Sequence, residues 1–76
     1  MNKERRKRIA KVFEELEEIM QEVEEIRDEE QEAYDNFPES LQESERGEAM
    51  SEAIENLGSA LDSVEEARNY LESAME

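Results

Sequence analysis

The sequence predicts an all-α protein in which two long helices pack antiparallel as a hairpin. Apolar residues recur at alternating steps of three and four in both halves of the 76-residue chain, which is the spacing of a helix that buries one face. Charged residues make up 43% of the chain, and only two glycines and one proline occur in it, as is typical of long helices. The single proline lies near the middle and separates the two periodic segments, so residues 1–76 form one domain.

The first helix is expected over residues 3–36, with an apolar core stripe along it. The stripe comprises Ile9, Val12, Leu16, Ile19, Val23, Ile26, Ala33 and Phe37. Phe13, Met20 and Tyr34 each follow a stripe position by one residue, so the apolar surface is wider than a seam between two helices. Glu30 falls on the stripe, and Arg46 across the turn is its expected ion-pair partner.

The turn is expected over residues 37–44. Pro38 disfavours helical geometry at the residue before it and cannot continue the hydrogen-bond ladder. The segment after the proline is compatible with one short helical turn that folds Leu41 onto the core. Ser44 has the side chain of an N-cap residue, and Gly47 at the third helical position weakens that start.

The second helix is expected over residues 45–75, with large and small apolar residues in alternate columns. One column holds Met50, Leu57, Val64 and Leu71, and the other holds Ala53, Ala60, Ala67 and Ala74. We expect the alanines and Gly58 to allow a close approach of the helices, with Val23 beside Leu61. The basic start of the chain then lies near Glu72 and Glu76.

The width of the stripe predicts self-association, because two helices cannot cover it. A second hairpin would complete a four-helix bundle, so a homodimer is favoured, and the alternative is a helix from a different protein. The residues expected to carry self-association are Phe13, Leu16, Met20, Val23, Leu57, Leu61, Val64 and Leu71.

The net charge of −15 is unevenly distributed along the chain. Residues 1–11 hold six basic side chains and one acid, for a net charge of +5, whereas the remainder holds three arginines and 23 acids, for −20. This surface disfavours direct binding to nucleic acid or to anionic membranes. The basic cluster either pairs with the acidic end of the second helix or contacts a phosphate backbone or an acidic partner.

Two residue types that many catalytic and zinc sites use are missing. The chain contains no cysteine and no histidine, which removes the usual general base, the thiolate nucleophile and most zinc ligands. The glutamate clusters are interpreted as a solvated helix face. We therefore expect no enzyme activity, no cofactor and no metal. No apolar run is long enough for a membrane span or a signal peptide, so the cytoplasm is the expected location.

The turn carries the motif Asn-x-Pro-Glu-x-Leu-Gln-x-Ser-Glu-Arg over residues 36–46. Residues 29–48, which contain this motif, resemble a group of small helical-hairpin proteins encoded by phages and prophages, in which a similar turn joins two acidic helices. The resemblance covers most of the chain and implies expression in a bacterial host cytoplasm. It also marks the turn as scaffold or as contact surface through Asn36, Pro38, Glu39, Leu41, Gln42, Ser44 and Arg46.

Two functional hypotheses follow from these patterns. The first is a protein-interaction module, a self-associating hairpin that serves as an accessory or adaptor protein of a phage and binds a host or phage protein. The alternative is a phage-encoded inhibitor of a host defence or nucleic-acid enzyme, whose acidic faces imitate a phosphate backbone. A small-ligand site at an oligomer interface stays open as a third interpretation.

Overall fold

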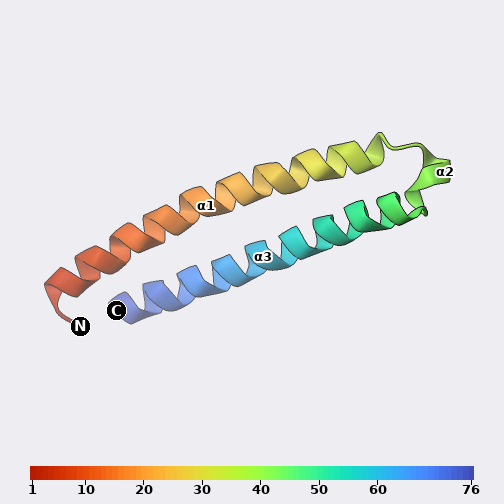
Figure 1. The fold of residues 1–76 in the computed structure, drawn as a ribbon. Coiled ribbons are helices and arrows are strands. Elements are labelled where there is room, and N and C mark those ends of the chain that lie inside the picture. The colour runs from red at the N-terminus through yellow and green to blue at the C-terminus, as the bar shows by residue number, and fades with distance from the viewer.

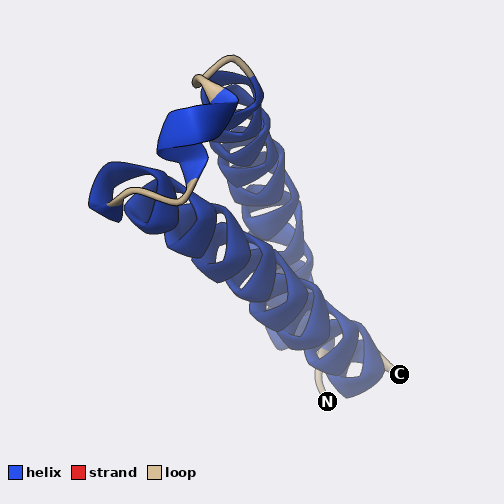
Figure 2. Cartoon of the chain, turned by 90° about the vertical axis from the view of Figure 1, so that its right-hand side faces the viewer, coloured by secondary structure: helices blue, strands red, loops and turns tan.

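A computed structural model describes residues 1–76 as three helices: α1 (Lys3–Asp35), α2 (Glu39–Gln42) and α3 (Glu45–Met75). The two long helices run antiparallel and pack against each other, α2 lies at the closed end of the hairpin, and both termini lie at the open end (Figure 1). The view along the rod shows helices and loops and no strand (Figure 2). The all-helical prediction is confirmed.

Local capping chemistry sets the limits of α1. The side-chain oxygen of Asn2 accepts a hydrogen bond from the backbone N–H of Arg5 at 2.8 Å, as an N-cap residue does. The helix ends at Asp35, one residue before the expected end, and Asn36 is its C-cap. The N–H of Asn36 still donates to the Glu32 carbonyl at 3.0 Å, but Pro38 cannot extend the ladder.

Ser44 connects α2 to α3. Its hydroxyl oxygen accepts a hydrogen bond from the N–H of Gly47 at 3.3 Å, which confirms it as the N-cap of α3. The same hydroxyl donates to the carbonyl of Leu41 at the end of α2. One serine therefore closes the short helix and starts the long one, and α3 spans the expected residues 45–75.

The rows through which α1 faces α3 differ from the expected stripe. The half-buried residues of α1, together with Phe37 just after it, are Ile9, Phe13, Leu16, Met20, Val23, Arg27, Glu30, Tyr34 and Phe37. Val12, Ile19 and Ile26, expected on the stripe, are 43%, 48% and 46% exposed. Two adjacent columns of α1 are apolar, and the column with the larger Phe13, Met20 and Tyr34 side chains lies in the contact.

The contact rows of α3 need a matching correction. They comprise Met50, Ile54, Leu57, Leu61, Val64, Arg68, Leu71 and Met75. The alanine column lies at the edge of the contact, where Ala60, Ala67 and Ala74 are exposed. Gly58 does not mark a close approach either, because a Cβ atom built on it would meet nothing within 4 Å.

Arg68 reports the register of the two long helices. Its guanidinium lies 4.5 Å from the centre of the Phe13 ring, and its NH1 atom lies 3.5 Å from the sulfur of Met20. Residue 68 therefore faces the interval between residues 13 and 20, which agrees with the expected placement of Val23 beside Leu61.

The single chain leaves an unusually large surface in contact with water. Its accessible area is 6003 Å², whereas a compact monomer of 8.9 kDa would expose about 4,800 Å². Its radius of gyration is 17.2 Å, against about 11 Å for a compact chain of this length. Only Gly47 and Leu61 are buried, so the hairpin has almost no enclosed core of its own.

Candidate functional site

The turn is held together by a network centred on Gln42. Its side-chain amide donates to the carbonyl of Tyr34 at 3.1 Å and to that of Phe37 at 3.3 Å. Tyr34 lies in the last turn of α1 (Lys3–Asp35), where its carbonyl also accepts from the N–H of Phe37 at 3.1 Å, and Phe37 lies two residues beyond the helix end. Gln42 therefore ties α2 to the end of α1, which favours the scaffold interpretation of the turn.

Gly47 provides the space in which α2 packs on the first turn of α3. A Cβ atom built on Gly47 would lie 2.1 Å from the carbonyl oxygen of Gln42 and 2.5 Å from its carbonyl carbon. Both neighbours are backbone atoms and cannot rotate away. Gly47, expected to weaken the helix start, is therefore required by the packing of α2 on α3.

Two other expectations for the turn are corrected. Leu41 does not fold onto a core, since it is 46% exposed. Arg46 does not pair with Glu30, because its guanidinium lies over the ring of Phe37, 5.7 Å from the ring centre. Glu30 has no ion-pair partner and stays half-exposed, so water solvates its carboxylate.

The remaining residues of the turn motif have local roles. Asn36 caps α1 and Pro38 precedes the first turn of α2, where its carbonyl accepts from the N–H of Leu41 at 2.8 Å. Glu39 lies in that first turn, where the partial positive charge of a helix N-terminus stabilises a carboxylate. The motif therefore serves mainly to connect the two long helices.

Replacement of Gln42 by alanine should lower the free energy of unfolding by about 1–3 kcal/mol, since it removes two hydrogen bonds from partly buried carbonyls. Urea unfolding followed by circular dichroism measures the effect. The matched control is Gln31→Ala, which removes the exposed bond from Gln31 to Asp35 and should change stability by less than about 0.5 kcal/mol. Equal effects of the two substitutions would contradict the bridging role of Gln42.

The expected self-association residues lie between the helices of one chain. Leu61 is buried, and the other members of that set are half-buried: Phe13, Leu16, Met20, Val23, Leu57, Val64 and Leu71. They are therefore largely occupied before any second chain binds. The sequence does contain a signal for the exposed residues. It is the second apolar column of α1, whose members each stand one residue before the half-buried column.

An exposed apolar row runs along one edge of α1. It consists of Val12, Ile19, Ile26 and Ala33, spaced seven residues apart and all exposed. Seven residues correspond to two helical turns, so these side chains lie in line along the helix. A soluble monomer rarely aligns three large aliphatic side chains in water, and such a row marks an interaction surface.

The alanine column of α3 lies on the same side of the hairpin. The row on α1 precedes half-buried Phe13, Met20 and Tyr34 by one residue, and the alanine column precedes Ile54, Leu61 and Arg68 in the same way. Because the helices are antiparallel, positions of equal offset fall on the same side of the pair. We call this surface the apolar face; its members are Val12, Ile19, Ile26, Ala33, Ala53, Ala60, Ala67 and Ala74.

The flank of α3 beside the alanine column is uncharged. The neighbouring positions are Ala49, Asn56, Ser63 and Tyr70, and Tyr70 is 69% exposed. The opposite edge of the hairpin instead carries acids, with Glu17 and Glu24 on α1 and Glu65 and Glu72 on α3. The hairpin therefore has one apolar edge and one acidic edge, a difference that a monomer does not require.

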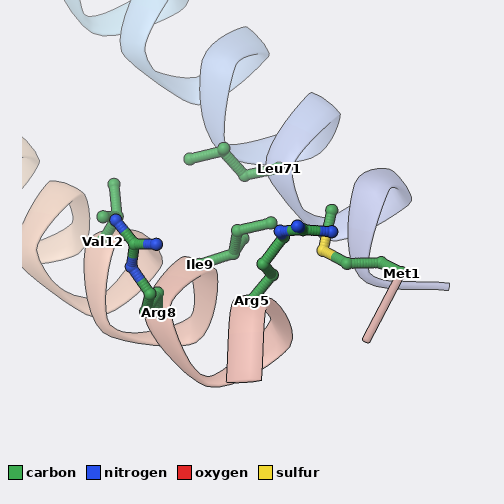
Figure 3. Close-up of a pocket in the computed structure, with 6 residues that line it drawn as sticks. All are labelled: Met1, Arg5, Arg8, Ile9, Val12 and Leu71. Carbon is green, nitrogen blue, oxygen red and sulfur yellow. The ribbon is translucent and has the colours of Figure 1, made fainter. Parts of the chain in front are cut away.

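The apolar face ends in a hollow beside the basic N-terminus. The hollow has a volume of about 310 Å³ and is lined by Met1, Arg5, Arg8, Ile9, Val12 and Leu71. Ile9 and Leu71 point toward one another from α1 and α3, and both arginines extend from the same helix as Ile9 (Figure 3). An apolar floor with two guanidinium groups beside it suits an apolar side chain that is followed by a carboxylate.

The basic cluster of residues 1–11 is not neutralised by its own chain. The ion pairs of the structure join Arg27 to Asp28 at 3.4 Å and Arg68 to Glu17 at 4.0 Å. The expected pairing of the cluster with Glu72 or Glu76 is not formed. Arg6 instead donates to the carbonyl of Met75 at 3.0 Å, so the positive charges of the open end remain available.

No three carboxylates converge as ligands for a metal ion. None of the helices combines the length and the apolar composition that a membrane crossing requires. Comparisons with protein-family models, with curated proteins and with solved structures gave no match.

Proposed function

We propose that this protein is a non-enzymatic protein-interaction module that works as a homodimer, two hairpins forming a four-helix bundle through their apolar faces. The observation that carries the proposal is the exposed row of Val12, Ile19 and Ile26, at 43%, 48% and 46% exposure. A second hairpin on this face would enclose the row and supply the core that the single chain lacks.

The surface area supports this proposal. The chain exposes about 1,200 Å² more than a compact monomer of its mass would, the difference between 6003 Å² and about 4,800 Å². A stable protein interface buries about 800 Å² on each partner. The excess is therefore large enough to be removed by one interface along the length of the rod.

The setting we propose is that of a phage accessory or adaptor protein in a bacterial cytoplasm. The support is the turn motif of residues 36–46 and its resemblance to the phage and prophage hairpins. In a dimer that buries the apolar faces, the acidic outer faces and the turns stay exposed. These surfaces would be the ones offered to a host or phage protein.

The absolute mass in solution, measured by light scattering behind a sizing column at low and high salt, tests the proposal. We expect a dimer that persists at 1 M salt, because apolar contacts do not depend on charge attraction. Salt should even strengthen it, since each chain carries −15 and the Debye length falls from about 10 Å at 0.1 M to about 3 Å at 1 M. A monomer at every protein concentration up to the millimolar range would overturn the proposal.

A second candidate is an inhibitor that imitates a nucleic-acid backbone, and the arrangement of acids favours it. The outward face of α3 carries exposed Glu48, Glu52 and Glu55 in a surface without apolar side chains. Such a face would bind a basic groove, and its affinity would fall steeply as salt rises. Binding to a host nucleic-acid enzyme that is indifferent to salt would eliminate this candidate.

A further inference from the structure

We infer that the second copy docks on the apolar face in reverse orientation, so that α1 packs against α1 of the other copy and the two turns lie at opposite ends. This inference rests on the proposed self-association and adds the orientation, the register and the pairing of charges. It is carried by three observations: the charge separation along the rod, the central place of Ile19, and the hollow beside the basic end.

Charge favours the reverse orientation. The open end combines residues 1–11, at +5, with residues 66–76, which hold three acids and one arginine, so its net charge is +3. Residues 28–55 around the turn hold eleven acids and one arginine, for a net charge of −10. Reversing one copy sets each positive end beside a negative end, whereas the same orientation would set the two negative ends together.

The apolar row has the symmetry that a reversed pair needs. Ile19 is the central residue of α1 (Lys3–Asp35), and Val12 and Ile26 lie seven residues on either side of it. A two-fold axis at Ile19 therefore sets Ile19 against its own copy and Val12 against Ile26 of the other copy, which is the self-complementary pattern of a two-fold interface.

The α3 helices fit the same axis. It brings the alanine columns of the two copies side by side, and small side chains allow the helices to approach closely. It also carries Tyr70 of each copy toward Asn56 and Ala60 of the other. The 69% exposure of Tyr70 in the single chain is then explained, because a ring that covers small side chains is a common feature of interfaces.

The hollow at the basic end receives matching residues in this register. Val12 lines it and faces Ile26 of the second copy, so the isoleucine enters the apolar part. Arg8 also lines it and faces Glu29 of the second copy, one turn beyond that isoleucine. The apolar floor of the hollow thus contacts an isoleucine, and the Arg8 guanidinium faces a carboxylate.

Single-cysteine variants test the orientation directly, because the natural chain has no cysteine. Ile19→Cys should oxidise to a covalent dimer, since the two copies of residue 19 meet at the axis. Val12→Cys should not, because its two copies lie about 21 Å apart along the helix, beyond the roughly 7 Å between Cα atoms that a disulfide tolerates. The double variant Val12→Cys/Ile26→Cys should again form covalent dimers, although Val12→Cys alone does not.

The outcomes separate this inference from the proposed function. If light scattering shows a dimer but Ile19→Cys forms no disulfide, self-association stands and the reverse orientation is overturned. In the alternative orientation α1 faces α3 of the other copy, so Ile19→Cys would cross-link only together with Ala67→Cys. If the unmodified chain is a monomer, both claims are overturned.

A charge exchange tests the proposed register. Arg8→Glu alone and Glu29→Arg alone should each weaken the dimer about threefold to tenfold, and the variant with both changes should recover most of the lost affinity. Neither residue forms an ion pair within its own chain, so the monomer should remain helical in all three variants. Effects that simply add in the double variant would contradict the facing of these two residues.

Discussion

Substitution of Gly47 by alanine should lower the free energy of unfolding by about 3–5 kcal/mol, a large loss for a chain of this size. The new Cβ atom would lie 2.1 Å from the backbone oxygen of Gln42, so α2 has to move away from α3. Overpacking of this kind costs about 1–3 kcal/mol. The displacement also breaks the two hydrogen bonds from Gln42 to the end of α1, at about 1 kcal/mol each.

Thermal and urea unfolding at equal protein concentration measures this effect, with Gly58→Ala as the matched control. Gly58 also lies within α3, but a Cβ atom there meets nothing within 4 Å. Gly58→Ala should therefore raise stability by about 1 kcal/mol, since alanine is the better helix former. Opposite signs for the two changes are expected. A Gly47→Ala protein as stable as the parent would contradict the packing of α2 on α3.

The two glycines show where sequence reasoning stops. The helical pattern predicts Gly47 as a weak start and Gly58 as a close approach. The prediction for Gly58 is wrong, and the prediction for Gly47 misses the packing of α2 that requires a glycine. The need for Gly47 arises from the path of α2 after Pro38, which places the carbonyl of Gln42 over the first turn of α3. No periodicity reports that path, because it depends on how the turn folds in three dimensions.

The helix limits were predictable because local chemistry sets them. Ser44 was recognised as a cap, and Pro38 was recognised as the break, from residue type alone. The structure places α3 at the expected residues and shortens the first helix by one. Such signals involve neighbours in the chain, so they survive without knowledge of the tertiary contacts.

The choice of contact rows was not predictable in the same way. Val12 and Phe13, or Ile19 and Met20, are adjacent apolar residues, and the periodicity of α1 is satisfied by either column. In the structure the bulkier column packs against α3, and Val12 and Ile19 stay exposed to water. The sequence predicts the width of the stripe. The residues it predicts for self-association, however, lie in the contact between α1 and α3 of a single chain.

Glu30 and Arg46 were expected to pair because they approach each other across the turn. Arg46 lies over the ring of Phe37 instead, a contact that keeps its charge partly hydrated. An exposed ion pair would have contributed less than about 1 kcal/mol, so the competing contact needs little energy to prevail. Pairings of long charged side chains are therefore poorly determined by sequence.

Replacement of both Ile19 and Ile26 by glutamate should convert the proposed dimer to a helical monomer. Each isoleucine is about half exposed in the single chain, so an interface would gain roughly 1 kcal/mol from covering each one further. The two-fold axis doubles the count, so four isoleucines contribute on the order of 4 kcal/mol, about a thousandfold in the dissociation constant. Burying the new carboxylates would cost still more, and glutamate keeps the helix propensity of α1 high.

Light scattering gives the mass of this variant, and far-ultraviolet circular dichroism at low protein concentration gives its helix content. Leu41→Glu is the matched control, because Leu41 is 46% exposed, as Ile26 is, but lies in α2 and off the apolar face. The control should remain a dimer. Loss of the dimer in both variants would mean that charge alone drives the chains apart, and retention in both would show that the apolar face is not the interface. Substitution of Leu16 and Leu61 could not make this distinction, because both residues lie in the contact between α1 and α3.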